Sequence, residues 1–195
     1  MNMRTYIITG LVALAVITGL AYLYVKAVPP TVPNMQSQGK ESMVPYENAA
    51  YDISFQYPSS LYVREVEAGT PDNPQHAIVL VKDTEENRAL LDGTSETATE
   101  GPTAITIDIY ENEDGLSVRD WVQESTNWTV ANSGANDAEV AGKQGISYGW
   151  SGLYEGTSYV IPYNDRMYVF SVSWLSPDDQ IVRDFNMVLM TTVFN

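Results

Sequence analysis

Alternation of apolar and polar side chains in the C-terminal part of the chain, from Gln144 to Asn195, constrains the fold more than any other feature. In the run from Arg166 to Trp174 every second residue is large and apolar, the period of two that places one set of side chains on a single face of a β-strand. We expect that face to be the buried one, and it carries Tyr168, Phe170, Val172 and Trp174. The run from Tyr159 to Tyr163 alternates in the same way, and the Asn164-Asp165 pair between the runs favours a two-residue hairpin turn. The sequence therefore predicts two antiparallel neighbours.

A helix is predicted directly after this hairpin. Ser176 is in position to be its N-cap, Pro177 its first residue and Asp179 an acid in its first turn. One apolar stripe of helical period follows, formed by Ile181, Val182, Phe185, Val188 and Leu189. We expect this helix to lie across the sheet and residues 191–194 to return as a short strand.

Earlier in the chain, further strands are predicted where apolar residues alternate or run together between turn residues. They cover residues 53–57, 61–66, 77–81, 105–109 and 146–150, with a short strand at 139–141. Residues 83–101 are polar and acidic and are expected to be a loop excursion, with at most a short helix at 85–91. A second helix is expected to begin after Ser117, which has an acid three residues later at Asp120, and to end near Thr126.

The N-terminal region has a different composition. Residues 6–25 carry no charge, and twenty helical residues span about 30 Å, which is enough to cross a bilayer. We interpret residues 1–26 as a signal-anchor with one transmembrane helix. A cleaved signal peptide is the alternative, although its apolar region is usually shorter. Residues 27–45, with Pro29, Pro30 and Pro33 near their start and few apolar residues, are expected to be a spacer, and residues 46–195 the globular domain. The predicted location is the cell membrane, single-pass, with the C-terminal domain extracytoplasmic.

Composition excludes several kinds of site. The chain has no cysteine, so it has no disulfide, thiolate metal site or cysteine nucleophile. After Lys40 there are seven Lys and Arg against 25 Asp and Glu, a formal charge of −18, and a surface of that kind disfavours nucleic acid. His76 is the sole histidine, and we expect it to be structural or at the surface. No Gly-x-Ser-x-Gly motif is present, so no catalytic residue is assigned and the chain is predicted not to be an enzyme.

Two groups of side chains are candidates for binding. The carboxylates of Asp108, Glu111, Glu113 and Asp114 are hard oxygen ligands of the kind that Ca²⁺ or Mn²⁺ prefers, although a solvated loop explains the same run. No other cofactor is predicted. The aromatics that are not needed in the core are candidates for a partner site, and these are Tyr154, Tyr159 and Tyr163.

The order of these elements, together with two short segments, resembles the PsbP/Mog1-like family. The first segment is Tyr51-Asp52-Ile53-Ser54-Phe55-Gln56-Tyr57-Pro58, which is similar to the opening strand of that family and its Tyr-Pro stop, and the second is the closing run from Phe185 to Phe194. The resemblance implies an α+β fold in which an antiparallel sheet of about six strands is flanked by helices as an α/β/α sandwich, here preceded by a transmembrane helix. It also implies a non-catalytic accessory or binding role with an envelope protein as partner. A low-affinity site that binds or senses a divalent cation is the alternative function.

Overall fold

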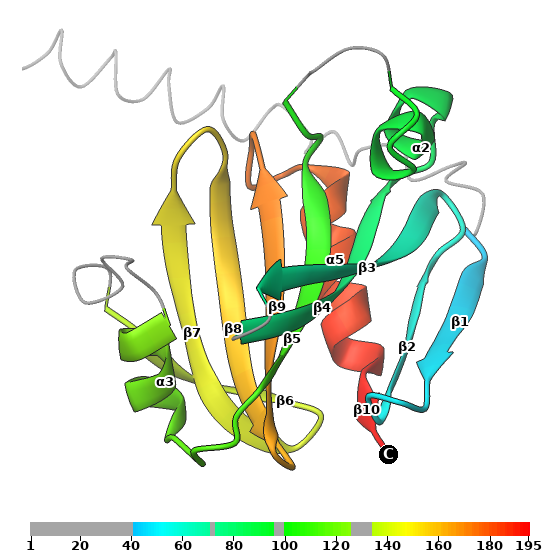
Figure 1. The fold of residues 1–195 in the computed structure, drawn as a ribbon. Coiled ribbons are helices and arrows are strands. Elements are labelled where there is room, and N and C mark those ends of the chain that lie inside the picture. Colours follow the sequence, from blue (N-terminus) through cyan, green and yellow to red (C-terminus); the bar gives the residue numbers. More distant parts are fainter. Residues whose placement is uncertain (1–40, 71–72, 96–99, 126–133) are drawn as a thin grey trace, which may run out of the picture. The chain divides into compact units, whose positions relative to one another are not determined.

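The computed structural model describes residues 41–70, 73–95, 100–125 and 134–195 (Figure 1). The strands are β1 Met43–Asn48, β2 Ile53–Pro58, β3 Leu61–Thr70, β4 Asn73–Lys82, β5 Ala104–Glu111, β6 Asn136–Val140, β7 Lys143–Ser151, β8 Glu155–Tyr163, β9 Arg166–Trp174 and β10 Val193–Phe194. The helices are α2 Glu85–Leu91, α3 Val118–Ser125 and α5 Gln180–Thr191. The predicted span at 6–25 lies outside the described residues. Within them, no helix is long and apolar enough to cross a membrane.

A seven-stranded antiparallel sheet forms the body of the domain, in the order β3-β4-β5-β9-β8-β7-β6. The predicted pairing of the two aromatic runs is confirmed, because Tyr163 lies opposite Arg166 in the β8–β9 ladder. The turn between them places Asn164 at φ 52°, a left-handed conformation that asparagine adopts more readily than most residues. The Asn164-Asp165 pair between two alternating runs was therefore sufficient to predict this hairpin.

Both faces of this sheet are covered, as the predicted α/β/α arrangement requires, although the alternation from Arg166 to Trp174 indicated burial of one face only. Tyr168 and Phe170 lie in the larger core, against α5. Val169 points the other way and is also buried, in a second core beneath α3 that contains Trp121 and Tyr148. The alternation identified the larger core only, because the period of a strand does not show what packs on its second face.

Helix α5 begins at Gln180, three residues later than the predicted start at Pro177. Asp179 occupies the N-cap position with extended backbone angles. Its carboxylate Oδ2 accepts the backbone N–H groups of Leu175 at 3.0 Å and Ser176 at 2.9 Å. These bonds hold the stretch before the helix in a turn, so Pro177 is not the first helical residue. The apolar stripe is as predicted, with Ile181, Phe185 and Val188 buried.

The helix predicted after Ser117 is confirmed as α3, and α2 forms within the stretch 83–101 that was expected to be a loop with at most a short helix. The Thr84 hydroxyl accepts the N–H of Asn87 at 3.2 Å at the start of α2. At the start of α3, the Ser117 hydroxyl accepts the N–H of Asp120 at 3.2 Å and donates to its carboxylate at 2.5 Å. Each cap satisfies a backbone donor that a helix leaves without a partner in its first turn.

A separate three-stranded sheet, in the order β1-β2-β10, brings the first and last strands of the domain together (Figure 1). The short C-terminal strand was predicted, and Val193 pairs with Ser54. Strand β1 was not predicted, and it begins at Met43, inside the stretch 27–45 expected to be a spacer. Pro45 argued against a strand in the sequence, because proline lacks a backbone N–H, but it is tolerated on an edge strand such as β1. The described residues thus form ten strands in two sheets, where about six in one sheet were expected.

Candidate functional site

Asp108, the first of the four predicted metal ligands, is an internal residue of β5. Its carboxylate accepts hydrogen bonds from Gln75 Nε2 at 2.6 Å and from Thr106 Oγ1 at 3.1 Å. Burial raises the pKa of Asp108, while these two hydrogen bonds act in the opposite direction. The side chain is therefore already bound by its neighbours within the sheet.

The other three acids lie apart from Asp108. Glu111, at the end of β5, forms an ion pair with Arg166 at 3.1 Å, and Glu113 and Asp114 are exposed in the turn that follows. In the part of the chain that the structure describes, no group of three or more His, Asp or Glu side chains is placed to hold a metal ion. The structure thus does not bring the four predicted ligands together.

The three predicted partner-binding tyrosines lie in two places. Tyr159 and Tyr163 border the larger core, where the Tyr159 ring lies 5.9 Å from that of Phe185 and the Tyr163 ring 4.7 Å from that of Phe194. Tyr154 lies beyond the other end of β8, in the turn from β7, and its hydroxyl donates to the carbonyl of Gly101 at 2.7 Å. They do not form one surface.

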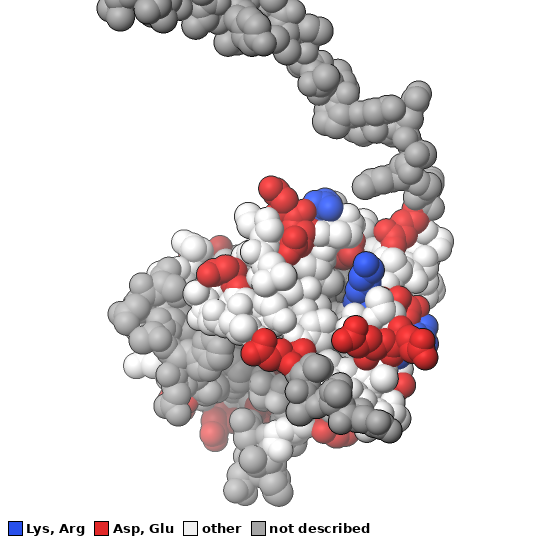
Figure 2. Space-filling model, turned by 90° about the horizontal axis from the view of Figure 1, so that it is seen from above, with Lys and Arg blue, Asp and Glu red and all other residues white. Residues whose placement is uncertain are grey.

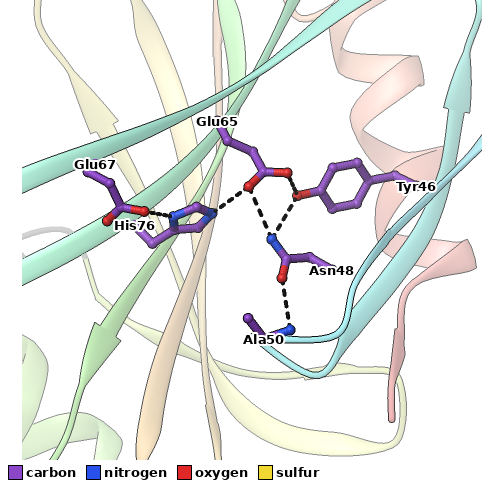
Figure 3. Close-up of polar contacts among 6 residues, drawn as sticks. All are labelled: Tyr46, Asn48, Ala50, Glu65, Glu67 and His76. Carbon is purple, nitrogen blue, oxygen red and sulfur yellow. Dashed lines mark hydrogen bonds and ion pairs between the residues drawn. The ribbon is translucent and has the colours of Figure 1, made fainter.

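The sole histidine lies in a polar cluster that was not predicted. His76, on β4, is only 5% exposed, and Glu67 and Glu65 approach it from β3 (Figure 3). Its Nδ1 lies 2.7 Å from Glu67 Oε1, and its Nε2 lies 3.3 Å from Glu65 Oε2. The second contact is an ion-pair separation without hydrogen-bond geometry, and Nε2 has no hydrogen-bond partner. We call Glu65, Glu67 and His76 the histidine cluster.

Glu65 extends the cluster to the small sheet. Tyr46 Oη on β1 donates to Glu65 Oε1 at 2.7 Å, and Asn48 Nδ2 donates to Glu65 Oε2 at 3.1 Å (Figure 3). Asn48 Oδ1 in turn accepts the N–H of Ala50 at 3.0 Å, which shapes the turn after β1. Burial raises the pKa of the Tyr46 hydroxyl, so it stays a donor to this carboxylate. One carboxylate therefore connects β3 to β1 and to the turn.

Tyr51, in the same turn, lies over the histidine. The Tyr51 and His76 rings are stacked with centroids 4.1 Å apart, and the Arg166 guanidinium also lies over the Tyr51 ring at 5.1 Å. Arg166 donates to the carbonyl of Ala50 at 3.1 Å as well. The alternation of Glu65 and Glu67 along β3 was a signal that both point to one side, but only strand pairing shows that His76 lies opposite Glu67.

A second unpredicted feature is an apolar surface where β7, β8 and β9 meet. Leu153 is 62% exposed in the β7–β8 turn, and Leu175 is 76% exposed just after β9. Tyr154 lies beside Leu153. We call Leu153, Tyr154 and Leu175 the strand-end surface. The sequence signal was weak, since it consists of single leucines beside Gly152 and Ser176 in turns.

Acidic side chains surround this surface. Glu155 and Asp178 are exposed and close to it in sequence, and the exposed Glu100 precedes Gly101, whose carbonyl accepts the Tyr154 hydroxyl. Figure 2 looks down on this end of the sheet and shows an uncharged area with Asp and Glu side chains around it and few Lys or Arg. Single exposed leucines are ordinary on protein surfaces, but two beside a tyrosine within an acidic rim form a site with a recognisable chemistry.

Comparisons with known proteins bear on the fold. The sequence matches no protein-family model and no curated protein sequence. Among solved structures, the cyanobacterial PsbP protein CyanoP from Synechocystis sp. PCC 6803 is similar, with a TM-score of 0.50 and 13% identity over 84% of this chain and 99% of that chain. A protein from Bacteroides thetaiotaomicron VPI-5482 has a TM-score of 0.45 and 11% identity over 77% of this chain and 48% of that chain. The likeness to CyanoP confirms the predicted α+β architecture, and the chain has a PsbP-like fold.

Proposed function

We propose that this chain is a membrane-tethered, non-catalytic accessory domain that binds another protein of the cell envelope through the strand-end surface. The observation that carries the proposal is the exposure of Leu153 and Leu175 at one end of the sheet, beside Tyr154. Burying such side chains against a partner removes apolar area from water, and tyrosine is enriched among the residues that carry most of the binding energy of an interface.

Charge indicates the chemistry of the partner. The formal charge of −18 after Lys40 and the acidic rim repel anionic lipid and nucleic acid. A protein surface that offers an apolar recess with Lys or Arg around it would bury the leucines and pair with Glu100, Glu155 and Asp178. We therefore infer a basic protein partner.

The non-catalytic assignment is supported by the surroundings of His76. Both ring nitrogens face glutamate carboxylates, so the ring is not placed to activate a hydroxyl nucleophile. The alternative of a cation-binding or sensing domain has less support, since Asp108 and Glu111 already bind Gln75 and Arg166. Calorimetric titration with Ca²⁺ and Mn²⁺ tests it directly, and heat at submicromolar to millimolar metal would favour it.

The uncharged run at 6–25 supports the tether. Protease added to intact spheroplasts should remove the domain, and the remaining short fragment should stay with the membrane. Complete protection of the domain would contradict the extracytoplasmic location, and release of the uncut chain in soluble form would contradict the anchor.

Binding is tested with a photo-crosslinking residue at position 153 in cells, followed by identification of the adduct and titration of the purified partner. Leu175→Asp should weaken binding by at least tenfold, and added salt should weaken binding to the unmodified chain. Met190→Asp is the matched control, because Met190 is an equally apolar residue that is 84% exposed on α5. Equal loss of affinity in both variants, or none in Leu175→Asp, would overturn the proposed surface.

A further inference from the structure

The carboxylate of Asp179 lies at the N-terminus of α5 but does not cap that helix. An aspartate at the N-cap position ordinarily stabilises its helix by accepting a backbone N–H from the first turn. Asp179 occupies this position, yet within α5, which the structure describes in full, its side chain makes no such bond. The carboxylate is directed instead to the residues that precede the helix.

Both hydrogen bonds of this carboxylate go to the backbone at the strand-end surface. Oδ2 of Asp179 accepts the N–H of Leu175 at 3.0 Å and that of Ser176 at 2.9 Å. Leu175 lies just beyond the β8–β9 ladder, whose last pair is Glu155 and Trp174. In the part of the chain that the structure describes, the bond to Asp179 is therefore the only hydrogen bond of the Leu175 backbone.

Other bonds hold the turn that follows Leu175, but they do not reach Leu175 itself. The carbonyl of Ser176 accepts the N–H of Asp179 at 3.0 Å, and Arg183 donates to the carbonyl of Asp178 at 2.6 Å. These bonds should keep the turn and the start of α5 in place when the Asp179 side chain is removed. The Leu175 side chain is 76% exposed, so packing does little to fix its direction. The Asp179 carboxylate is thus the main restraint on Leu175, while the surrounding turn has restraints of its own.

We propose that Asp179 is a positioning residue of the strand-end surface, an inference that rests on the function proposed for that surface. By holding the backbone of Leu175, the carboxylate orders this apolar anchor before a partner arrives. An anchor that is already ordered loses less conformational freedom in the complex, so the partner binds more tightly. Asp179 acts through Leu175 and not by its own charge, and the side chain that could cap α5 serves the partner site instead.

Two substitutions in the full-length chain separate positioning from charge. Asp179→Asn removes the charge but keeps an amide oxygen that can accept both N–H groups, whereas Asp179→Ala removes both bonds. The probe is the photo-crosslinking residue at position 153, and the readout is the yield of its adduct in cells. That yield should fall about threefold to tenfold in Asp179→Ala and less than about twofold in Asp179→Asn. In a Leu175→Ala background, Asp179→Ala should cause no further fall, because the effect of Asp179 is exerted through Leu175.

Hydrogen exchange of the free chain tests the positioning without a partner. The amides of Leu175 and Ser176 should be protected in the unmodified chain and in Asp179→Asn, and should exchange about tenfold faster in Asp179→Ala. Ser117→Ala is the control for a general loss of stability, because it removes a cap bond of α3, beyond the opposite end of β5. That control should leave the adduct yield unchanged.

The outcomes distinguish the positioning role from the proposed surface. If Leu175→Ala lowers the adduct yield and Asp179→Ala does not, the positioning role is overturned and the surface stands. An equal fall in Asp179→Asn would assign the effect to charge, and a further fall in the Leu175→Ala background would assign it to another part of the fold; either result overturns the inference. Unchanged exchange at Leu175 and Ser176 in Asp179→Ala overturns it whatever the partner does. A yield that Leu175→Ala leaves unaltered contradicts the proposed surface, and the inference with it.

Discussion

Gly145 is a position at which a single added methyl group should overlap the backbone of a neighbouring strand. It lies buried in β7, between the neighbouring strands β6 and β8. A Cβ built on its backbone would lie 2.1 Å from the carbonyl oxygen of Val160 and 2.6 Å from Cδ1 of Ile161. The nearer atom belongs to the backbone of β8, so no side-chain rotation relieves the overlap. Gly145→Ala must therefore move β7 away from β8.

The expected cost is about 2 to 3 kcal/mol of unfolding free energy, the range for overpacking a close-packed interior. Gly149→Ala on the same strand is the matched control, because its Cβ would have nothing closer than the carbonyl oxygen of Gly156 at 3.7 Å. Replacing that glycine should change stability by less than about 1 kcal/mol and in the favourable direction, since alanine loses less backbone entropy.

Urea unfolding followed by tryptophan fluorescence measures both variants against the unmodified chain, with the midpoints compared at equal slope. A stability of Gly145→Ala within about 0.5 kcal/mol of the unmodified chain would refute the reasoning, because the overlap would then have been relieved at no cost. An equal loss in Gly149→Ala would also refute it, since the effect would then belong to any side chain on β7.

Three further outcomes are expected. Asp108→Asn should raise the unfolding free energy by about 1 kcal/mol at neutral pH and have little effect near pH 3. Burial raises the pKa of Asp108, so the folded protein disfavours the ionised carboxylate, and the unmodified chain loses stability as the pH rises through the folded-state pKa of Asp108. A lower unfolding free energy of Asp108→Asn than of the unmodified chain at neutral pH would contradict this. Thr191→Val should cost about 1 kcal/mol, because Thr191 Oγ1 bonds both the N–H and the carbonyl of Gln56, and Thr191→Ser, which keeps the hydroxyl, should lose less. Phe194→Ala should cost about 2 to 3 kcal/mol in urea unfolding, since its ring contacts those of Tyr163 and Tyr168 at 4.7 and 5.0 Å, whereas Val193→Ala, at an exposed neighbour, should be nearly neutral.

Local chemistry made much of the fold predictable. The Ser117 cap of α3, the left-handed turn at Asn164 and the alternation along β9 each involve residues within a few positions of one another. The predicted start of α5 was wrong because the Asp179 carboxylate accepts hydrogen bonds from the backbone of the preceding turn. The same residues suit either a helix that starts at Pro177 or a turn followed by a helix, and the local sequence does not distinguish the two. Strand β1 was missed because its pairing with β2 comes from the packed sheet and not from its own pattern.

The candidate sites were less predictable than the fold. The acidic run looked like one site because its members are close in sequence, but β5 directs Asp108 into the sheet and ends before Glu113 and Asp114. Leu153 and Leu175 are exposed because no other segment of the described domain packs over them, and this cannot be predicted from the residues next to them in the sequence.

By itself, the sequence determined the order of most strands and helices, the pairing of β8 with β9 and the acidity of the surface. Periodicity, capping and charge act over a few residues, so they can be read along the chain. Only the tertiary structure decided which residues pack in the second core beneath α3, that β1, β2 and β10 form a sheet of their own, and that Glu65 and Glu67 enclose His76. These are contacts between distant segments, and their geometry comes from the packing of the whole domain.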